Sequence, residues 1–201
     1  SALELSWRPG TRVQVHVGPE MEVEESDLQF VARREHDGEA RHLLAALRQE
    51  TLAATMRIDA CVTPNLTVQY YAQPFLAAGR FGRFQRVADG MAGRYRDRTR
   101  AFGPEEARFD PGSGSWSFDE DRDGTADYAV ADPNFTWRAF QSNLVLRWEY
   151  RPGSTLYAVW SQGREAEGAG GELDFGRDVE RLFDTHPHDV FLVKVSRWFS
   201  W

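Results

Sequence analysis

The sequence has almost no cysteine and no long hydrophobic run. Its 201 residues include one cysteine, Cys61, which excludes an internal disulfide framework. No window approaches the roughly eighteen consecutive apolar residues of a transmembrane helix, although alternating strands of a transmembrane β-barrel would keep the mean hydropathy equally low. Acidic residues outnumber basic ones, 31 to 24, so the net charge is -7. Without a basic stripe interleaved with aromatic residues, we expect no nucleic-acid partner.

A secretory signal does not open the sequence. Residues 1–8 already alternate apolar and polar side chains, as a strand does. This start in mid-pattern predicts that further strands precede residue 1.

What the sequence does contain is alternation with the period of two of a β-strand, in segments whose apolar residues fall on one face. The pattern predicts an all-β protein with about seven antiparallel strands. The alternating segments are residues 3–8, 12–24, 51–62, 66–73, 143–150, 155–160 and 190–201.

The connections between these segments are short at one end of the predicted strands and long at the other. Three pairs, Pro9-Gly10, Pro64-Asn65 and Pro152-Gly153, predict tight turns. The long connections are residues 24–50, 79–133 and 164–188. An outer-membrane barrel has this asymmetry, with short periplasmic turns and long external loops.

We expect residues 79–133 and 164–188 to form external loop regions. The first contains an expected small hairpin over residues 116–130 and a possible short helix near 84–91, and the second a helical patch around 179–183.

Residues 37–38 are Asp-Gly, the favoured pair for a two-residue type I′ turn. A hairpin centred there pairs residues whose numbers sum to 75, which places Val13 opposite Val62 and His16 opposite Asp59. The apolar parity switches farther along both strands, and there we expect a bulge or a twist.

Residues 65–75, 143–155 and 189–195 resemble a bacterial outer-membrane family known as domain of unknown function family 5916. The resemblance runs along most of the chain. It implies a carbohydrate-binding-module-family-9-like domain followed by a large β-barrel, with this chain forming the carboxyl-terminal third or less. It supplies no catalytic residues, and any carbohydrate binding that it implies belongs to the amino-terminal domain.

An acidic segment has the DxDxDG spacing that places carboxylates around one cation, with Gly124 at the sharp turn. Its hard oxygen ligands suit calcium. The twelfth position is Val130 rather than the bidentate Glu of an EF-hand, so the alternative is a plain acidic turn in a hairpin. The candidate calcium ligands are Asp119, Asp121, Asp123 and Asp127.

Other possible sites have simpler explanations. His186 and His188 could bind a metal, but nothing nearby in sequence completes a tetrahedral set, which favours an exposed loop. Charged pairs such as Arg147 with Glu149 are typical of neutralised charges inside a barrel rather than of acid–base catalysts. The terminal Trp201 ends a strand as in the signal read by barrel-assembly machinery, although an ordinary closing strand has the same pattern.

Taken together, these patterns predict an antiparallel up-and-down transmembrane β-barrel in the bacterial outer membrane, of which residues 1–201 are the carboxyl-terminal part. We expect a structural or transport-related role, linked to carbohydrate binding or uptake through an amino-terminal domain, and no enzyme activity in this part. The expected partners are outer-membrane lipid, the assembly machinery and upstream strands.

The alternative is a soluble β-sandwich module that binds calcium or carbohydrate. A carboxylate enzyme is a third hypothesis, but no pair of acids is positioned for it. Seven strands cannot close an even-numbered barrel, so we expect an open, curled sheet. If the chain is part of a membrane barrel, we expect no second layer of protein to cover the face that carries Val15, Ile58, Val68 and Leu146.

Overall fold

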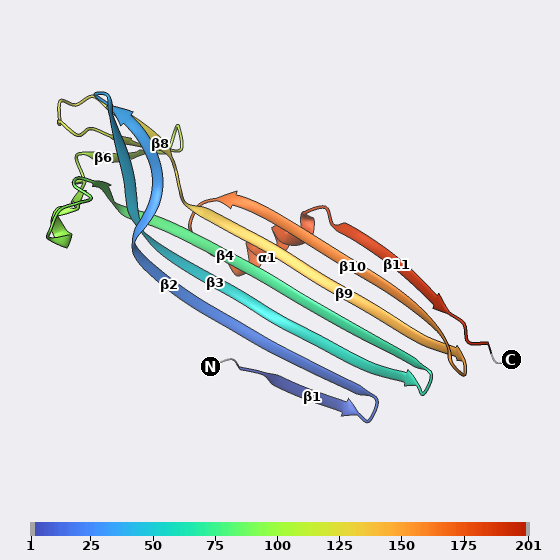
Figure 1. The fold of residues 1–201 in the computed structure, drawn as a ribbon. Coiled ribbons are helices and arrows are strands. Elements are labelled where there is room, and N and C mark those ends of the chain that lie inside the picture. The colour runs from blue at the N-terminus through green and yellow to red at the C-terminus, as the bar shows by residue number, and fades with distance from the viewer. Residues whose placement is uncertain (1–2, 200–201) are drawn as a thin grey trace.

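The computed structural model describes residues 3–199, so Trp201 lies outside the described residues. Most of the chain forms one antiparallel sheet with the strand order β1-β2-β3-β4-β9-β10-β11, and β5 pairs with β4 beside this path (Figure 1). The predicted all-β antiparallel class is confirmed. The strands are β1 (Leu5–Gly10), β2 (Val13–His36), β3 (Glu39–Thr63), β4 (Leu66–Val87), β5 (Thr99–Ala101), β9 (Phe135–Arg151), β10 (Ser154–Ala169) and β11 (His188–Ser196).

A smaller sheet and a helix lie in the long connections. The hairpin predicted over residues 116–130 is confirmed, because Trp116 pairs with Val130. The predicted helical patch lies within a helix, but the helix expected near residues 84–91 is wrong, since β4 continues to Val87 and no helix follows in that segment. The additional elements are η1 (Tyr95–Asp97), β6 (Ala107–Asp110), β7 (Ser115–Phe118), β8 (Tyr128–Ala131) and α1 (Phe175–Asp184).

Tight turns occupy residues 64–65 and 152–153 as predicted. The first turn is wrong by two residues: β1 includes Pro9-Gly10 and the turn falls at Thr11-Arg12, because Gly10 still pairs with Val13. Strands β4 and β10 also run farther than expected, into the segments 79–133 and 164–188.

The hairpin of β2 and β3 turns at residues 37–38, where Asp37 and Gly38 have φ values of 52° and 73°. His36 pairs with Glu39, as predicted. Two register shifts then fall between Ser26 and Ala32, where the parity switch predicted a bulge.

These shifts make the predicted register wrong by two residues over the rest of the hairpin. Val13 lies opposite Ala60, and His16 lies opposite Arg57 rather than Asp59. An even shift leaves each side chain on its original face, so apolar residues still meet apolar residues.

The pairing arranges the side chains into cross-strand rows, and each row belongs to one face. One apolar row crosses seven strands through Trp7, Val15, Ile58, Tyr70, Leu144, Trp160 and Phe191. A second apolar row, from Val13 to Val193, runs beside it.

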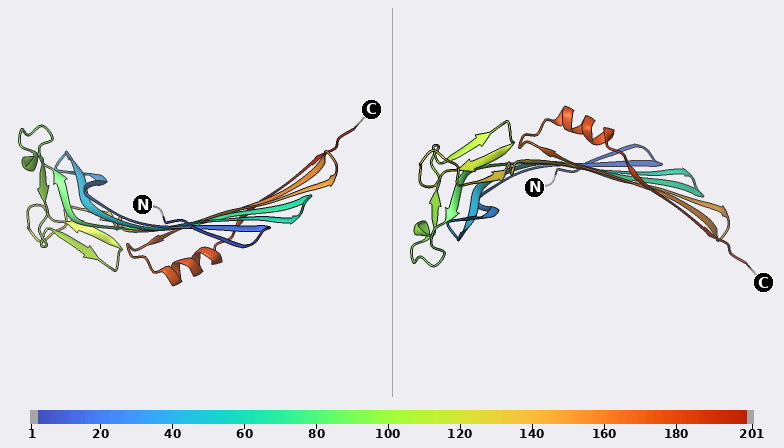
Figure 2. Two further views of the ribbon diagram at one scale, coloured as in Figure 1. Left: turned by 90° about the horizontal axis from the view of Figure 1, so that it is seen from below. Right: turned by 90° about the horizontal axis from the view of Figure 1, so that it is seen from above.

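The sheet is open and bowed (Figure 2). Within residues 3–199, β1 and β11 form its two edges and do not pair with each other. Helix α1 lies on the convex side, and the short turns lie at the end opposite the small sheet (Figures 1 and 2). An open sheet is what we expected of seven strands.

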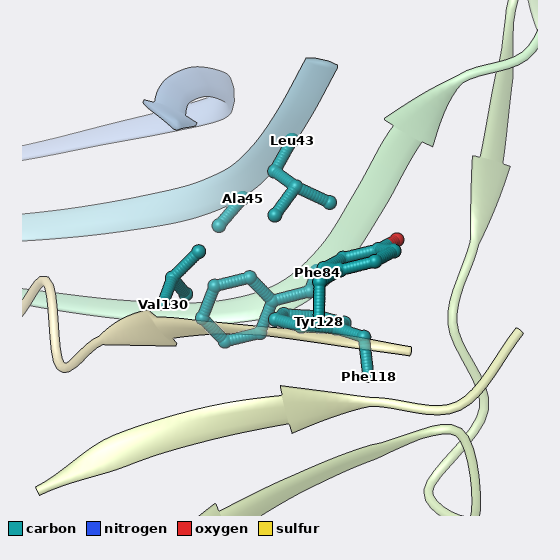
Figure 3. Close-up of a cluster of buried hydrophobic side chains, with 6 residues drawn as sticks. All are labelled: Leu43, Ala45, Phe84, Phe118, Tyr128 and Val130. Atoms are coloured by element: carbon teal, nitrogen blue, oxygen red, sulfur yellow. The ribbon is translucent and has the colours of Figure 1, made fainter. Parts of the chain in front are cut away.

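Two clusters of buried side chains form the core. The first joins the long-loop end of the main sheet to the small sheet (Figure 3), and Phe84 meets Phe118 there with ring centroids 5.4 Å apart. The second lies beneath α1, where Leu182 packs on Ala72, Leu76 and Phe140.

The apolar face is therefore partly covered, which corrects the expectation of a face without a second layer. Leu182 is fully buried, because α1 carries an apolar stripe of its own. Val15, Ile58, Val68 and Leu146, by contrast, are half-buried and belong to neither buried cluster. The covering reaches the row of Val15 and Ile58 only at Tyr70, and it ends before the row of Val68 and Leu146.

Candidate functional site

The first candidate site is the uncovered part of the apolar face. At the sheet's edges its aromatic side chains are open, with Trp7 64% and Phe191 74% exposed. Inner residues such as Leu146 are half-buried only by neighbouring strands. Contiguous apolar areas of this width are rare on soluble monomers and mark contacts with lipid or with another protein.

The opposite face is polar and its side chains largely bond to one another. Gln69 Nε2 donates to Asp59 Oδ1 at 2.9 Å, and Ser161 Oγ to Asn143 Oδ1 at 2.6 Å. The guanidinium of Arg57 lies 5.9 Å from the centre of the Tyr71 ring. Mutual pairing of this kind lets a polar face stay ordered without a bound ligand.

The charged pairs considered in the sequence are only partly formed. Arg147 Nη2 lies 3.5 Å from Glu149 Oε2, as expected. His16 Nδ1 contacts Glu4 Oε1 at 3.2 Å instead of Asp59, because of the shifted register.

The acidic loop brings together three of its four candidate ligands. Carboxylate oxygens of Asp119, Asp121 and Asp127 all lie within 4.8 Å of one another. Asp123 is outside this group, and its Oδ1 accepts a hydrogen bond from the Thr125 N–H at 2.7 Å. Gly124, with φ of 92°, makes the sharp turn that the spacing predicted.

Hydrogen bonds within the loop fix these carboxylates. Asp119 Oδ2 accepts from the Gly124 N–H at 3.0 Å, and Asp127 Oδ2 from the Glu120 N–H at 2.6 Å. The second oxygen of Asp119, Oδ1, is buried and receives no hydrogen bond from residues 3–199. All the candidate ligand atoms are oxygens, and one of them has no hydrogen-bond partner. Such a group suits a hard cation such as calcium.

Within residues 3–199 this is the one group of three such ligand side chains close enough to share an ion. His186 and His188 are both exposed and belong to no such group.

Sequence reasoning missed the buried ion pair beneath α1. Arg138 Nε lies 3.0 Å from Asp178 Oδ1, and their side chains are 5% and 0% exposed. Burial acts to raise the pKa of the Asp178 carboxyl, but the hydrogen bond from the Asp174 N–H and the contacts with Arg177 and Arg138 outweigh it and hold that pKa below its ordinary value.

A signal for this pair was present in the sequence. Arg138 occupies a position on the face of Phe140 and Leu144, where the pattern calls for an apolar residue. Asp178 interrupts the apolar stripe of α1 in the same way. Two charges out of pattern indicate a buried pair.

A second missed group lies in the connection between β5 and β6. Glu106 is 2% exposed and contacts Arg100 and Arg122. The Gly103 N–H donates to its Oε2 at 2.7 Å, and this bond is the main reason that the pKa of the Glu106 carboxyl is lowered. The Glu106 carboxylate thus connects Arg100, Gly103 and Arg122 within this part of the chain.

Comparison with protein-family models, curated proteins and solved structures gave no match. The resemblance to domain of unknown function family 5916 therefore stays a prediction. Within residues 3–199, no helix has the length and apolar character needed to cross a membrane.

Proposed function

We propose that this chain forms a section of the wall of a bacterial outer-membrane β-barrel. Its convex apolar face would contact lipid hydrocarbon, and its polar face would line the lumen. The observation that carries the proposal is the apolar row that crosses seven strands from Trp7 to Phe191, in which Tyr70 alone packs against the cluster beneath α1. The role is structural or transport-related, serving carbohydrate handling through the amino-terminal domain that the family resemblance implies.

Three further features support this proposal. Helix α1 packs on the apolar face through Leu182 and lies on the convex side of the sheet (Figure 2), so the apolar face is the convex one, which is the outer side of a barrel. The edges β1 and β11 leave backbone groups available for further strands, which we propose to be upstream strands of the same protein. The long, elaborated connections and the tight turns lie at opposite ends of the strands, as in barrels delivered by the assembly machinery.

The alternative, a soluble β-sandwich, needs a second layer over the whole apolar face. The small sheet and α1 supply such a layer only near the long loops. The row of Val68 and Leu146 remains without one, which favours the membrane proposal.

Two neighbouring residues on opposite faces provide the test. In the intact protein with Cys61→Ser, we would introduce Leu146→Cys or Val145→Cys, both half-buried positions of β9, and attach an environment-sensitive fluorophore. After reconstitution into phosphatidylcholine vesicles, nitroxides on the lipid acyl chains should quench the label at residue 146 and not at 145. Equal, negligible quenching of both labels, with the protein monodisperse without detergent, would refute the membrane proposal.

We also propose that the acidic loop binds calcium through Asp119, Asp121 and Asp127. The buried, unpaired Oδ1 of Asp119 supports this, because a cation would supply its missing partner. Without the bidentate twelfth ligand, we expect weak binding, with a dissociation constant of about 10⁻⁴ to 10⁻³ M.

Calorimetric titration of the intact protein with calcium tests this second proposal. Asp119→Asn should abolish the binding heat, whereas Asp123→Asn, which alters a carboxylate outside the group, should leave it nearly unchanged. No heat from the unmodified protein at millimolar calcium would leave the loop as an ordinary acidic turn.

A further inference from the structure

Helix α1 sits at the border of the uncovered apolar face. Its buried residue Leu182 packs on Leu76 of β4 and Phe140 of β9. Farther along β9, Leu144 and Leu146 continue the same face toward the short turns, and they belong to neither buried cluster. From Phe140 to Leu144 the strand advances by about 13 Å. The helix therefore lies directly beyond the end of the uncovered rows.

On β9, β10 and β11 the composition of the face changes at the same level. In the row next to Trp160, the side chains on β9, β10 and β11 are Ser142, Gln162 and Asp189 instead of apolar residues. On these three strands the change from apolar to polar side chains marks the place where a nonpolar environment ends, whereas on β2, β3 and β4 the same row stays apolar, with Val17, Met56 and Ala72.

Two aromatic side chains of α1 remain open although the helix is docked. Phe175 is 67% exposed and Phe183 48% exposed. The Phe183 ring packs against Phe140 with centroids 5.3 Å apart, so it is continuous with the apolar face of the sheet. Single exposed hydrophobic residues are common, but two rings on one ten-residue helix next to a wide apolar face extend that face.

The helix is held firmly in this position. The Arg138–Asp178 pair fixes its buried side, and Arg164 Nη1 donates to the Thr185 carbonyl at 3.1 Å at its carboxyl end. In the connection before it, a Cβ on Gly171 would lie 2.8 Å from the Gly79 carbonyl oxygen, so only glycine allows this approach. A docked helix presents its rings at one fixed level.

We propose that α1 lies in the lipid–water interface, with Phe175 and Phe183 among the lipid headgroups and the ends of the acyl chains. Aromatic rings concentrate at this depth, and amphipathic helices lie in its plane. Exposed charges of the helix, such as Glu180 and Arg181, face water and headgroups. The inference rests on the proposed function, because it places the external edge of the bilayer at the level of α1.

The test uses depth-dependent quenching in the intact protein with Cys61→Ser, reconstituted into phosphatidylcholine vesicles. A fluorophore is attached to Phe175→Cys or Phe183→Cys. Leu146→Cys reports on the hydrocarbon, and Tyr95→Cys, whose side chain is 69% exposed on η1, is the aromatic control far from the sheet's apolar face. Nitroxides are placed either on the headgroup or deep in the acyl chain.

The labels on α1 should lose more fluorescence with the headgroup nitroxide than with the deep one. The label at residue 146 should show the reverse, and that at residue 95 should lose little with either. Phe175 is not part of the contact with Phe140, so its variant keeps the test valid if Phe183→Cys alters the packing.

Each outcome bears on the inference. Labels on α1 that behave like residue 95 while residue 146 is quenched would overturn it and leave the proposed function intact. Stronger deep quenching on α1 would also overturn it, by placing the helix in the hydrocarbon. Failure of residue 146 as well would remove both proposals.

Discussion

At the scale of single residues, the contact between Arg138 and Asp178 holds α1 on the sheet. Both side chains are almost completely buried, and Asp178 also accepts a hydrogen bond from the Asp174 N–H at 2.8 Å. Removing one partner of a buried ion pair leaves an uncompensated charge, which costs more than the pair itself contributes.

We expect Asp178→Asn to destabilise the protein by about 3–5 kcal/mol at neutral pH, because Arg138 would stay buried without its counter-ion. The folded pKa of Asp178 is lowered, so its contribution is complete above the unfolded pKa of about 3.9 and is lost as the pH falls through the lower folded value. The difference between the variant and the unmodified protein should therefore shrink in strong acid.

Guanidinium unfolding of both proteins at pH 7 and below pH 3 measures this difference. Asp184→Asn, at an exposed position of the same helix, should change stability by no more than about 0.5 kcal/mol. If both variants unfold alike at pH 7, the ion pair does not stabilise the docked helix.

At the scale of elements, sequence periodicity predicted most strands because their two faces meet different environments. It could not place the register of β2 against β3, since the shifts between Ser26 and Ala32 depend on how the hairpin bends toward the small sheet. It ended β4 too early because Phe81 and Phe84 break the alternation, and only the small sheet explains them by packing on that strand.

For the acidic loop, the spacing predicted the turn at Gly124 and the three carboxylates that lie together, those of Asp119, Asp121 and Asp127. It could not exclude Asp123, because the hydrogen bond to Thr125 that directs this side chain elsewhere depends on the local backbone.

The pairing of β4 with β9 gives a prediction at this scale. Gly79 lies opposite Phe135, and a Cβ at residue 79 would come within 2.2 Å of the Phe135 ring. We expect Gly79→Ala to destabilise the protein by about 1–3 kcal/mol, because the ring would have to move in a packed region.

Gly82→Ala on the same strand is the matched control, since a Cβ there meets nothing within 4 Å. Chemical denaturation of the two variants should separate them clearly. Equal stability would mean that the Phe135 ring has another position available at little cost.

At the scale of the whole molecule, the open edges and the apolar face lead to one conclusion about assembly. The seven strands of the main path alternate in direction, so β1 and β11 run parallel to each other. Direct closure would join them as a parallel pair. An antiparallel seam at both edges instead requires an odd number of additional strands, which brings the total to the even number usual in bacterial barrels.

We therefore expect the intact protein in lipid to hold β11 between two antiparallel neighbours. Among residues 3–199, β11 pairs with β10 only, and all nine of its residues are exposed. An additional strand would protect the amides that point away from β10, so hydrogen exchange in β11 should be slow at every residue. Slow exchange only at amides bonded to β10 would mean that this edge stays open. If mutation of either edge strand removes the protection of both β1 and β11, the two strands pair with each other directly, and the seam between them is parallel.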